Sequence, residues 1–236
     1  MDNQNKKVNT YVISLDIALE RRKQIETTFG KYNQEYTIFS AIDGCDKKIM
    51  KELNKKYNSS IGYCQSACAI SHIKVLEQFI ETNDQYIIIM EDDAVLEKPL
   101  PTTVDEVESI FKEINVENPD IVYLHNNVRC NKKYKIIGGH GTFGYIYSRK
   151  GAIKTIKSLY PLNKPIDCYI NNNIKNGFLN GYRSKDFYIK HYDKGNSFLE
   201  KERRIEILHL LCLKIIPVIT FMGGVGALMY KDRKPI

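Results

Sequence analysis

Three consecutive acidic residues, Glu91-Asp92-Asp93, are the part of this sequence best suited to chemistry. Adjacent carboxylates repel one another, and a hard divalent cation, which prefers oxygen ligands, would neutralise the cluster. Such a cation would also hold a diphosphate and stabilise its charge as it leaves. The outer two side chains of an extended triplet point to the same side. We therefore expect Asp93 to bind the metal and Glu91 to reach a ribose or a metal-bound water. Asp92 is placed in the same nucleotide site without a separate role.

The alternative is that the triplet is a solvated acidic loop or a helix N-cap. The segment before it argues for a site, because Tyr86-Ile-Ile-Ile-Met90 is a continuous apolar run. Such runs are typical of strands buried on both faces of a mainly parallel sheet. Ligands of open α/β sheets bind beyond the carboxyl ends of the strands, which is where the triplet begins.

The elements that must position this triplet can be predicted from periodicity and turn signals. Apolar runs predict strands over residues 10–15, 36–40, 86–90, 121–124 and 145–148, with a strand-like segment at 186–190. Helical patterns cover residues 18–31, 47–58, 65–82, 103–114, 150–159 and 168–175. Asp16 is expected to cap the first helix, and Thr102 or Thr103 the fourth. Strands that alternate with helices predict an α/β fold with a largely parallel sheet.

Composition limits the function only loosely. The chain has 236 residues, of which 43% are hydrophobic, and this suits one domain with an appendage. The formal net charge of +7 favours anionic partners such as nucleotide-sugar phosphates, acidic lipids or nucleic acid. No aromatic and basic motif typical of nucleic-acid binding is present, so nucleic acid is not expected. A solvated basic surface is the alternative.

The cysteines and the N-terminus point to a reducing compartment. Six cysteines are scattered without a C-x-x-C pair, so we expect neither a zinc site nor disulfides. Residues 1–9 are polar and lack the apolar core of a signal peptide. Both features favour a cytoplasmic location.

Six segments, taken in order, resemble glycosyltransferase family 25, the lipooligosaccharide galactosyltransferases of Gram-negative bacteria and their relatives. They are residues 11–15 with Glu20-Arg21-Arg22, then 39–44, 62–72, 87–93, 141–145 with Gly151-Ala152, and 165–167. The resemblance spans roughly residues 10 to 170. It implies a GT-A-like (Rossmann-like) fold, a nucleotide-sugar donor that is most often UDP-galactose, and a divalent metal, Mn²⁺ or Mg²⁺.

The resemblance also assigns residues to the donor site. Ile13, Ser14 and Leu15 would meet the nucleotide at the edge of the sheet. Asp43 and Gly44 would bind the uridine or ribose, or form a plain turn. An arginine at position 21 or 22 would pair with the diphosphate or with Asp43, unless both lie on a solvated helix face.

Further residues are expected from the second half of the match. Ser71 and His72 would lie in the active site, with His72 contacting donor phosphate or sugar. Thr142 follows a glycine-rich stretch that would approach a sugar closely or form a flexible hairpin. Asp167 is our candidate general base for an inverting transfer, with a helix cap as the alternative.

Two expectations concern the end of the chain. His191 could supply a third metal ligand beside Asp93 and Glu91. Residues 205–230 are apolar and flanked by basic residues, an arrangement that suits an element lying in an anionic membrane surface. A core helix, a dimer helix or a transmembrane span are the alternatives. We therefore expect a catalytic domain over residues 1–200 and a helical, apolar and basic extension over residues 201–236.

Together these features predict a metal-dependent glycosyltransferase. It would transfer galactose from UDP-galactose, with inversion, to a sugar acceptor on a lipooligosaccharide or lipopolysaccharide. The enzyme would be peripheral on the cytoplasmic face of the inner membrane. One rival is a metal-dependent phosphohydrolase that uses the same carboxylates. The other is a non-catalytic protein that binds sugar or nucleic acid through its positive charge.

Overall fold

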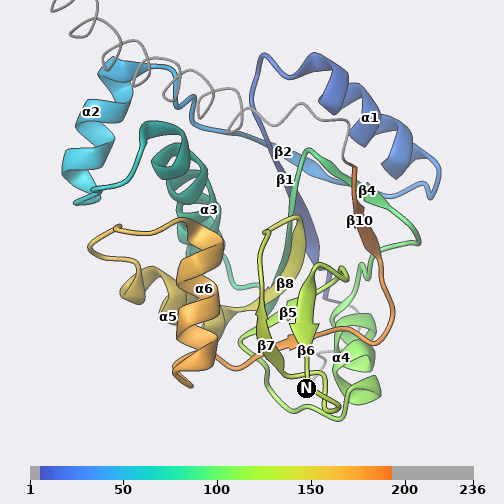
Figure 1. Ribbon diagram of the computed structural model, residues 1–236. Coiled ribbons are helices and arrows are strands. Elements are labelled where there is room, and N and C mark those ends of the chain that lie inside the picture. Colours follow the sequence, from blue (N-terminus) through green and yellow to red (C-terminus); the bar gives the residue numbers. More distant parts are fainter. Residues whose placement is uncertain (1–5, 193–236) are drawn as a thin grey trace, which may run out of the picture. The chain divides into compact units, whose positions relative to one another are not determined.

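A computed structural model describes residues 6–192, so the apolar segment 205–230 and the expected extension 201–236 lie outside the described residues. The centre is a six-stranded sheet with the order β2-β1-β3-β8-β5-β9 (Figure 1). Its strands are β1 (Asn9–Ser14), β2 (Thr37–Ser40), β3 (Tyr86–Glu91), β5 (Ile121–Tyr123), β8 (Gly144–Ser148) and β9 (Gly181–Arg183). The predicted α/β class is confirmed.

One strand of the sheet runs against the others. β1 is parallel to β2 and β3, and β5 is parallel to β9, but β8 is antiparallel to both β3 and β5. A parallel neighbour needs a long crossover, usually a helix. Between β5 and β8 the chain instead forms a hairpin of β6 (Val128–Cys130) and β7 (Ile136–Gly139). The chain therefore returns in the opposite direction.

Helices cover both faces of the sheet. They are α1 (Leu19–Gly30), α2 (Lys47–Lys56), α3 (Tyr63–Glu81), α4 (Val104–Glu113), α5 (Arg149–Ser158) and α6 (Ile166–Lys175). Ile87 and Ile89 of β3 lie in the core beneath α2, α3, α5 and α6. Ile88 and Met90 face the opposite core, with α1 and α4. The apolar run is thus buried on both faces, as predicted.

Several predicted boundaries need correction. Asp16 does not cap α1, whose N-cap is Ala18 without a side-chain hydrogen bond. The Asp16 carboxylate instead accepts hydrogen bonds from Arg22 and Ser40, which lower its pKa. Helix α6 begins at Ile166 rather than at residue 168. The last strand, β10, is Ile189–His191, and it pairs with β4 (Ala94–Leu96).

The predicted cap of the fourth helix is confirmed. Thr103 caps α4 in a capping box with Glu106, because each side chain binds the backbone N–H of the other residue. Within the described part of the chain, no disulfide joins cysteines 45, 64, 68, 130 and 168. No helix among residues 6–192 is long and apolar enough to cross a membrane.

Candidate active site

The acidic triplet lies where β3 ends, at the carboxyl edge of the parallel strands. Glu91 is the last residue of β3 and pairs in register with Ile13 of β1. Asp92 and Asp93 form the turn that leads into β4. The three side chains reach different partners, so they do not form one shared ligand set.

Asp92 is a structural residue. Its carboxylate accepts a hydrogen bond of 2.8 Å from Ser14 Oγ and lies 2.7 Å from the guanidinium of Arg21. Only 8% of Asp92 is exposed. Burial raises the pKa of Asp92, while Arg21 and Ser14 oppose the rise. Ser14 and Asp92 therefore join β1, α1 and the turn after β3, and their contact with the donor stays a prediction.

Glu91 is held by residues from three other elements. His72 Nε2 of α3 lies 3.1 Å from Glu91 Oε1, and the Thr142 hydroxyl donates to the same oxygen. The other ring nitrogen of His72 is hydrogen-bonded to the hydroxyl of Tyr145. His72 is only 1% exposed, so both nitrogens have protein partners and His72 positions Glu91. The contact of His72 with donor phosphate or sugar stays a prediction.

Asp93 meets His191, as the metal hypothesis requires. The Asp93 Oδ2 and His191 Nε2 atoms are 3.4 Å apart, and the His191 ring stacks on Phe143 at 4.2 Å between centroids. The other oxygen, Asp93 Oδ1, is buried and has no hydrogen-bond partner in the described part of the chain. A buried polar atom without a partner is costly, and a cation would provide the partner.

These two residues fit a divalent ion. Carboxylate and imidazole are ordinary ligands of Mn²⁺, and Mg²⁺ commonly uses one or two carboxylates together with substrate phosphates and water. Glu91 does not join a close three-residue ligand cluster with them among residues 6–192, because its nearby ligand-type neighbours are Cys68 and His72. A metal ion here would rely on Asp93, His191 and oxygens of a bound diphosphate.

Asp167 lies close to the same site. It is in the first turn of α6, where Oδ1 accepts from its neighbour Cys168 N–H at 2.7 Å and Oδ2 accepts from Gly141 N–H at 3.3 Å. The expected alternative, a cap, is wrong, because the N-cap of α6 is Pro165. His140 Nδ1 lies 3.4 Å from Asp167 Oδ2. The hydrogen bond from Gly141 thus brings the glycine-rich segment, and Thr142 that follows it, next to Asp167.

The partly buried thiol of Cys68 lies near three carboxylates. Burial raises the pKa of Cys68 well above its ordinary value, and the charges of Glu91, Asp167 and Asp93 raise it further. Cys68 lies on α3, one turn before His72. Neither Cys68 nor Tyr145 is predicted to be a site residue from the sequence. Cys68 could have been found from its helical spacing of four residues from His72. No local sequence pattern indicates Tyr145.

The loop after β2 is packed rather than open. Ser71 is fully buried, and its hydroxyl donates to Ala67 O and accepts from Ile42 N–H. Asp43 accepts from Cys45 N–H at 2.8 Å, which makes the plain turn that was the alternative. A side chain on Gly44 would lie 2.6 Å from Cys64 Cα, so the glycine permits close packing on α3. Ser71 therefore holds this loop on α3, and its contact with the donor stays a prediction.

The remaining nucleotide residues have mixed positions. Ile13 is buried in the core, whereas Leu15 is partly exposed at the end of β1. Arg22 lies 2.6 Å from Asp16 and donates to Ser14 O at 3.1 Å. Arg22 therefore pairs with Asp16 and not with Asp43, which was the alternative partner.

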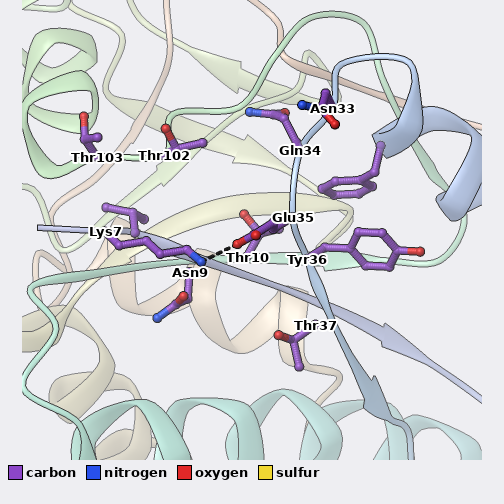
Figure 2. A pocket seen from close by; sticks show the side chains of 12 residues that line it. Lys7, Asn9, Thr10, Asn33, Gln34, Glu35, Tyr36, Thr37, Thr102 and Thr103 are labelled. Atoms are coloured by element: carbon purple, nitrogen blue, oxygen red, sulfur yellow. Dashed lines mark hydrogen bonds and ion pairs between the residues drawn. The ribbon is translucent and has the colours of Figure 1, made fainter. Parts of the chain in front are cut away.

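Two cavities lie at opposite edges of the sheet. One of about 710 Å³ opens beside His191, where Asn126, Asn127 and Phe187 contribute to its wall. The other, of about 730 Å³, lies where β1 and β2 begin, and Figure 2 shows Asn9, Thr37 and Thr102 around it. The second cavity contains none of the predicted site residues. The first is lined by His191, whose ring lies beside Asp93.

Comparisons with known proteins identify the family of this chain. A family model described as glycosyltransferase family 25 (LPS biosynthesis protein) matches residues 7–170. A putative glycosyltransferase of Haemophilus influenzae is 30% identical over 202 residues, which cover 79% of this chain and 68% of that protein. The lacto-N-neotetraose biosynthesis glycosyltransferase LgtB of Neisseria meningitidis serogroup B is 26% identical over 161 residues. The lipooligosaccharide biosynthesis protein lic2B of Haemophilus influenzae is 26% identical over 167 residues.

The matches to LgtB and lic2B cover part of each protein. The match to LgtB covers 61% of this chain and 58% of LgtB, and the match to lic2B covers 63% and 62%. The matched part therefore spans less than two thirds of either relative. The family model covers well over half of the chain and includes the triplet, Thr142 and Asp167. The chain therefore belongs to glycosyltransferase family 25, the family of LPS biosynthesis proteins.

Proposed function

We propose that this glycosyltransferase transfers galactose from UDP-galactose to a sugar acceptor of lipooligosaccharide or lipopolysaccharide, with inversion at the anomeric carbon. The observation that carries the proposal is the pairing of Asp93 with His191 in the region that also contains Asp167. The proposal is supported by the names of the relatives, which include lacto-N-neotetraose and lipooligosaccharide biosynthesis. The arrangement of a central sheet between two layers of helices agrees with a GT-A-like fold.

Asp93 and His191 are the residues that would hold Mn²⁺ or Mg²⁺. When bound, such an ion neutralises the diphosphate and stabilises the charge of the leaving group. Glu91, fixed by His72 and Thr142, presents its carboxylate beside this position. Arg21 offsets the negative charge of Asp92, so the turn can hold three acids without a second cation.

Asp167 is proposed as the general base. The acceptor hydroxyl oxygen would form a bond to the anomeric carbon while the bond from that carbon to the diphosphate breaks. The bonding electron pair leaves with UDP, and the hydroxyl proton passes to Asp167. The Gly141 N–H and the Cys168 N–H orient this carboxylate, and positioned bases of this kind contribute about 10²–10⁴-fold.

The acceptor is proposed to enter through the cavity beside His191. Phe187 is 39% exposed, and Asn126 and Asn127 are exposed at the same cavity. Aromatic faces and amide side chains are groups that bind sugar rings and hydroxyls. For a lipid-linked acceptor we propose a peripheral position on the cytoplasmic face of the inner membrane. Residues 205–230, which were expected to lie in the membrane surface, are outside the described residues.

The test is a donor screen on the full chain. UDP-galactose, UDP-glucose and UDP-N-acetylglucosamine are compared with and without Mn²⁺, first by thermal unfolding and then by transfer to a soluble oligosaccharide. We expect UDP-galactose to give the largest stabilisation with metal and a product of inverted configuration by NMR. Preference for another donor, retention of configuration or full activity in a chelator would each overturn that part of the proposal. Release of phosphate from simple phosphoesters without acceptor would favour a phosphohydrolase.

A further inference from the structure

A row of lysines on α2 is the strongest charged feature that the proposed function leaves unused. Lys47, Lys51 and Lys55 follow one another at intervals of four residues, so they lie on one side of the helix. Lys48 borders them, and the four lie within an arc of about 100°. All four side chains are exposed. We call Lys47, Lys48, Lys51 and Lys55 the lysine face.

The orientation of the lysine face is fixed by the opposite side of the helix. Met50 is fully buried in the core, and Leu53 packs against the same core. The Asp46 side chain caps α2 by accepting from the backbone N–H groups of Lys48 and Ile49. Figure 1 shows α2 beside α3, outside the central sheet. The lysine face is therefore held toward solvent by a well-ordered helix.

Nothing in the described part of the protein neutralises this face. Glu52 is the acidic residue of α2, and five lysines accompany it. Among residues 6–192, no ion pair is formed by the four lysines of the face. Like charges four residues apart weaken a helix. The helix thus concentrates positive charge that is complementary to an anion outside the protein.

The shape of the face indicates which anion fits. From Lys47 to Lys55 the row extends about 12 Å along the helix, and its lysines line neither of the two cavities described above. Lysine is a point charge, without the bidentate fork of arginine that selects a single phosphate. Ile49, which is 47% exposed, lies about 100° further round the helix than Lys48, so the face itself is charged throughout. A straight charged row of this length fits a surface of many headgroups better than one bound phosphate.

We propose that the lysine face docks this protein on a membrane surface that contains anionic phospholipids. Six residues separate the end of β2 from the start of α2, so α2 begins near the carboxyl edge of the parallel strands, where Asp93 also lies. Docking through α2 would keep the candidate active site close to a lipid-linked acceptor. This last consequence rests on the proposed function, whereas the docking itself does not.

The experiment is co-sedimentation of the full chain with phosphatidylcholine vesicles that contain or lack phosphatidylglycerol. Each lysine near an anionic surface contributes about fivefold to partitioning. The variant Lys47→Gln/Lys51→Gln/Lys55→Gln is therefore expected to bind roughly a hundredfold more weakly. Arginine at the same three positions should retain binding. About 1 M salt, with a Debye length of about 3 Å, should reduce the difference between the native protein and the glutamine variant.

The matched control is Lys132→Gln/Lys133→Gln/Lys135→Gln in the turn between β6 and β7. These lysines are exposed, and the substitution removes the same charge from another surface. The control is expected to bind vesicles as the native protein does. An equal loss in the control would mean that only net charge matters, and this would overturn the proposal. Undiminished binding of the α2 variant, or equal binding to pure phosphatidylcholine, would also overturn it.

Two further measurements distinguish membrane docking from nucleic-acid binding and from sugar transfer. Tighter binding to duplex DNA than to vesicles, lost in the same α2 variant, would overturn the docking proposal in favour of nucleic acid. Transfer to a water-soluble oligosaccharide by the α2 variant should remain at the native rate. If the native protein binds vesicles through α2 but transfers no sugar, the proposed function fails and the docking inference stands. If transfer proceeds without vesicle binding, the reverse holds.

Discussion

Replacement of Asp93 by alanine should separate metal binding from folding. The substitution removes Oδ2, which lies 3.4 Å from His191 Nε2, and the buried Oδ1, which lacks a partner in the described part of the chain. The first loss is destabilising and the second is stabilising. We therefore expect Asp93→Ala to fold normally and to lose its response to Mn²⁺.

The expected magnitudes follow from these two contacts. A partly exposed ion pair contributes about 0–1 kcal/mol, and a buried polar atom without a partner costs about 1–3 kcal/mol. The free energy of unfolding without metal should thus rise by about 0–3 kcal/mol. A ligand at about 100 times its Kd stabilises a protein by about 2.7 kcal/mol. At about 2–4 °C per kcal/mol, the native Tm should rise by about 5–10 °C when metal and UDP are added.

The assay is thermal unfolding with and without Mn²⁺ and UDP, followed by transfer measurements on the same samples. Glu117→Ala provides the control, because Glu117 is exposed and its loss changes the charge equally. The control should keep both the rise in Tm and full transfer. A native-sized rise in Asp93→Ala, or full metal-dependent transfer, would refute the assignment of Asp93. Unfolding of the variant without metal would instead show that the stability reasoning is wrong.

Three other predictions concern the same region. Asp167→Asn should lose about 10²–10⁴-fold in kcat while UDP-galactose binding by calorimetry stays unchanged, and surviving turnover would place the base elsewhere. Burial lowers the pKa of His125 to about 4. Between about pH 6.5 and 4 this side chain is therefore protonated in the unfolded chain but neutral in the folded protein. The free energy of unfolding in urea should therefore fall by up to about 3 kcal/mol between pH 6.5 and 4 from this residue, and His125→Gln should flatten that dependence. Gly44→Ala forces a methyl group to 2.6 Å from Cys64 Cα and should lower stability by about 1–3 kcal/mol, whereas Gly30→Ala, which meets no neighbouring atom, should not.

The sequence determined the elements and the place of the acidic triplet. Burial on alternate faces is a local property of a strand, so the run Tyr86–Met90 revealed a central strand without knowledge of its neighbours. The capping pattern of Thr103 and Glu106 likewise depends on residues only three apart. The family could be identified for the same reason, because its segments are short and occur in order along the chain.

Tertiary packing decided what each acid does. Asp92 is bound by Ser14 and Arg21. Glu91 is bound by His72 and Thr142, and Asp93 lies next to His191. These partners lie far away in the sequence, and no local pattern specifies which of three adjacent carboxylates each will reach. The direction of β8 was also decided by the chain's return through a hairpin. Short-range periodicity records which face of an element is buried, but the partner of a polar side chain is fixed only when distant elements pack together.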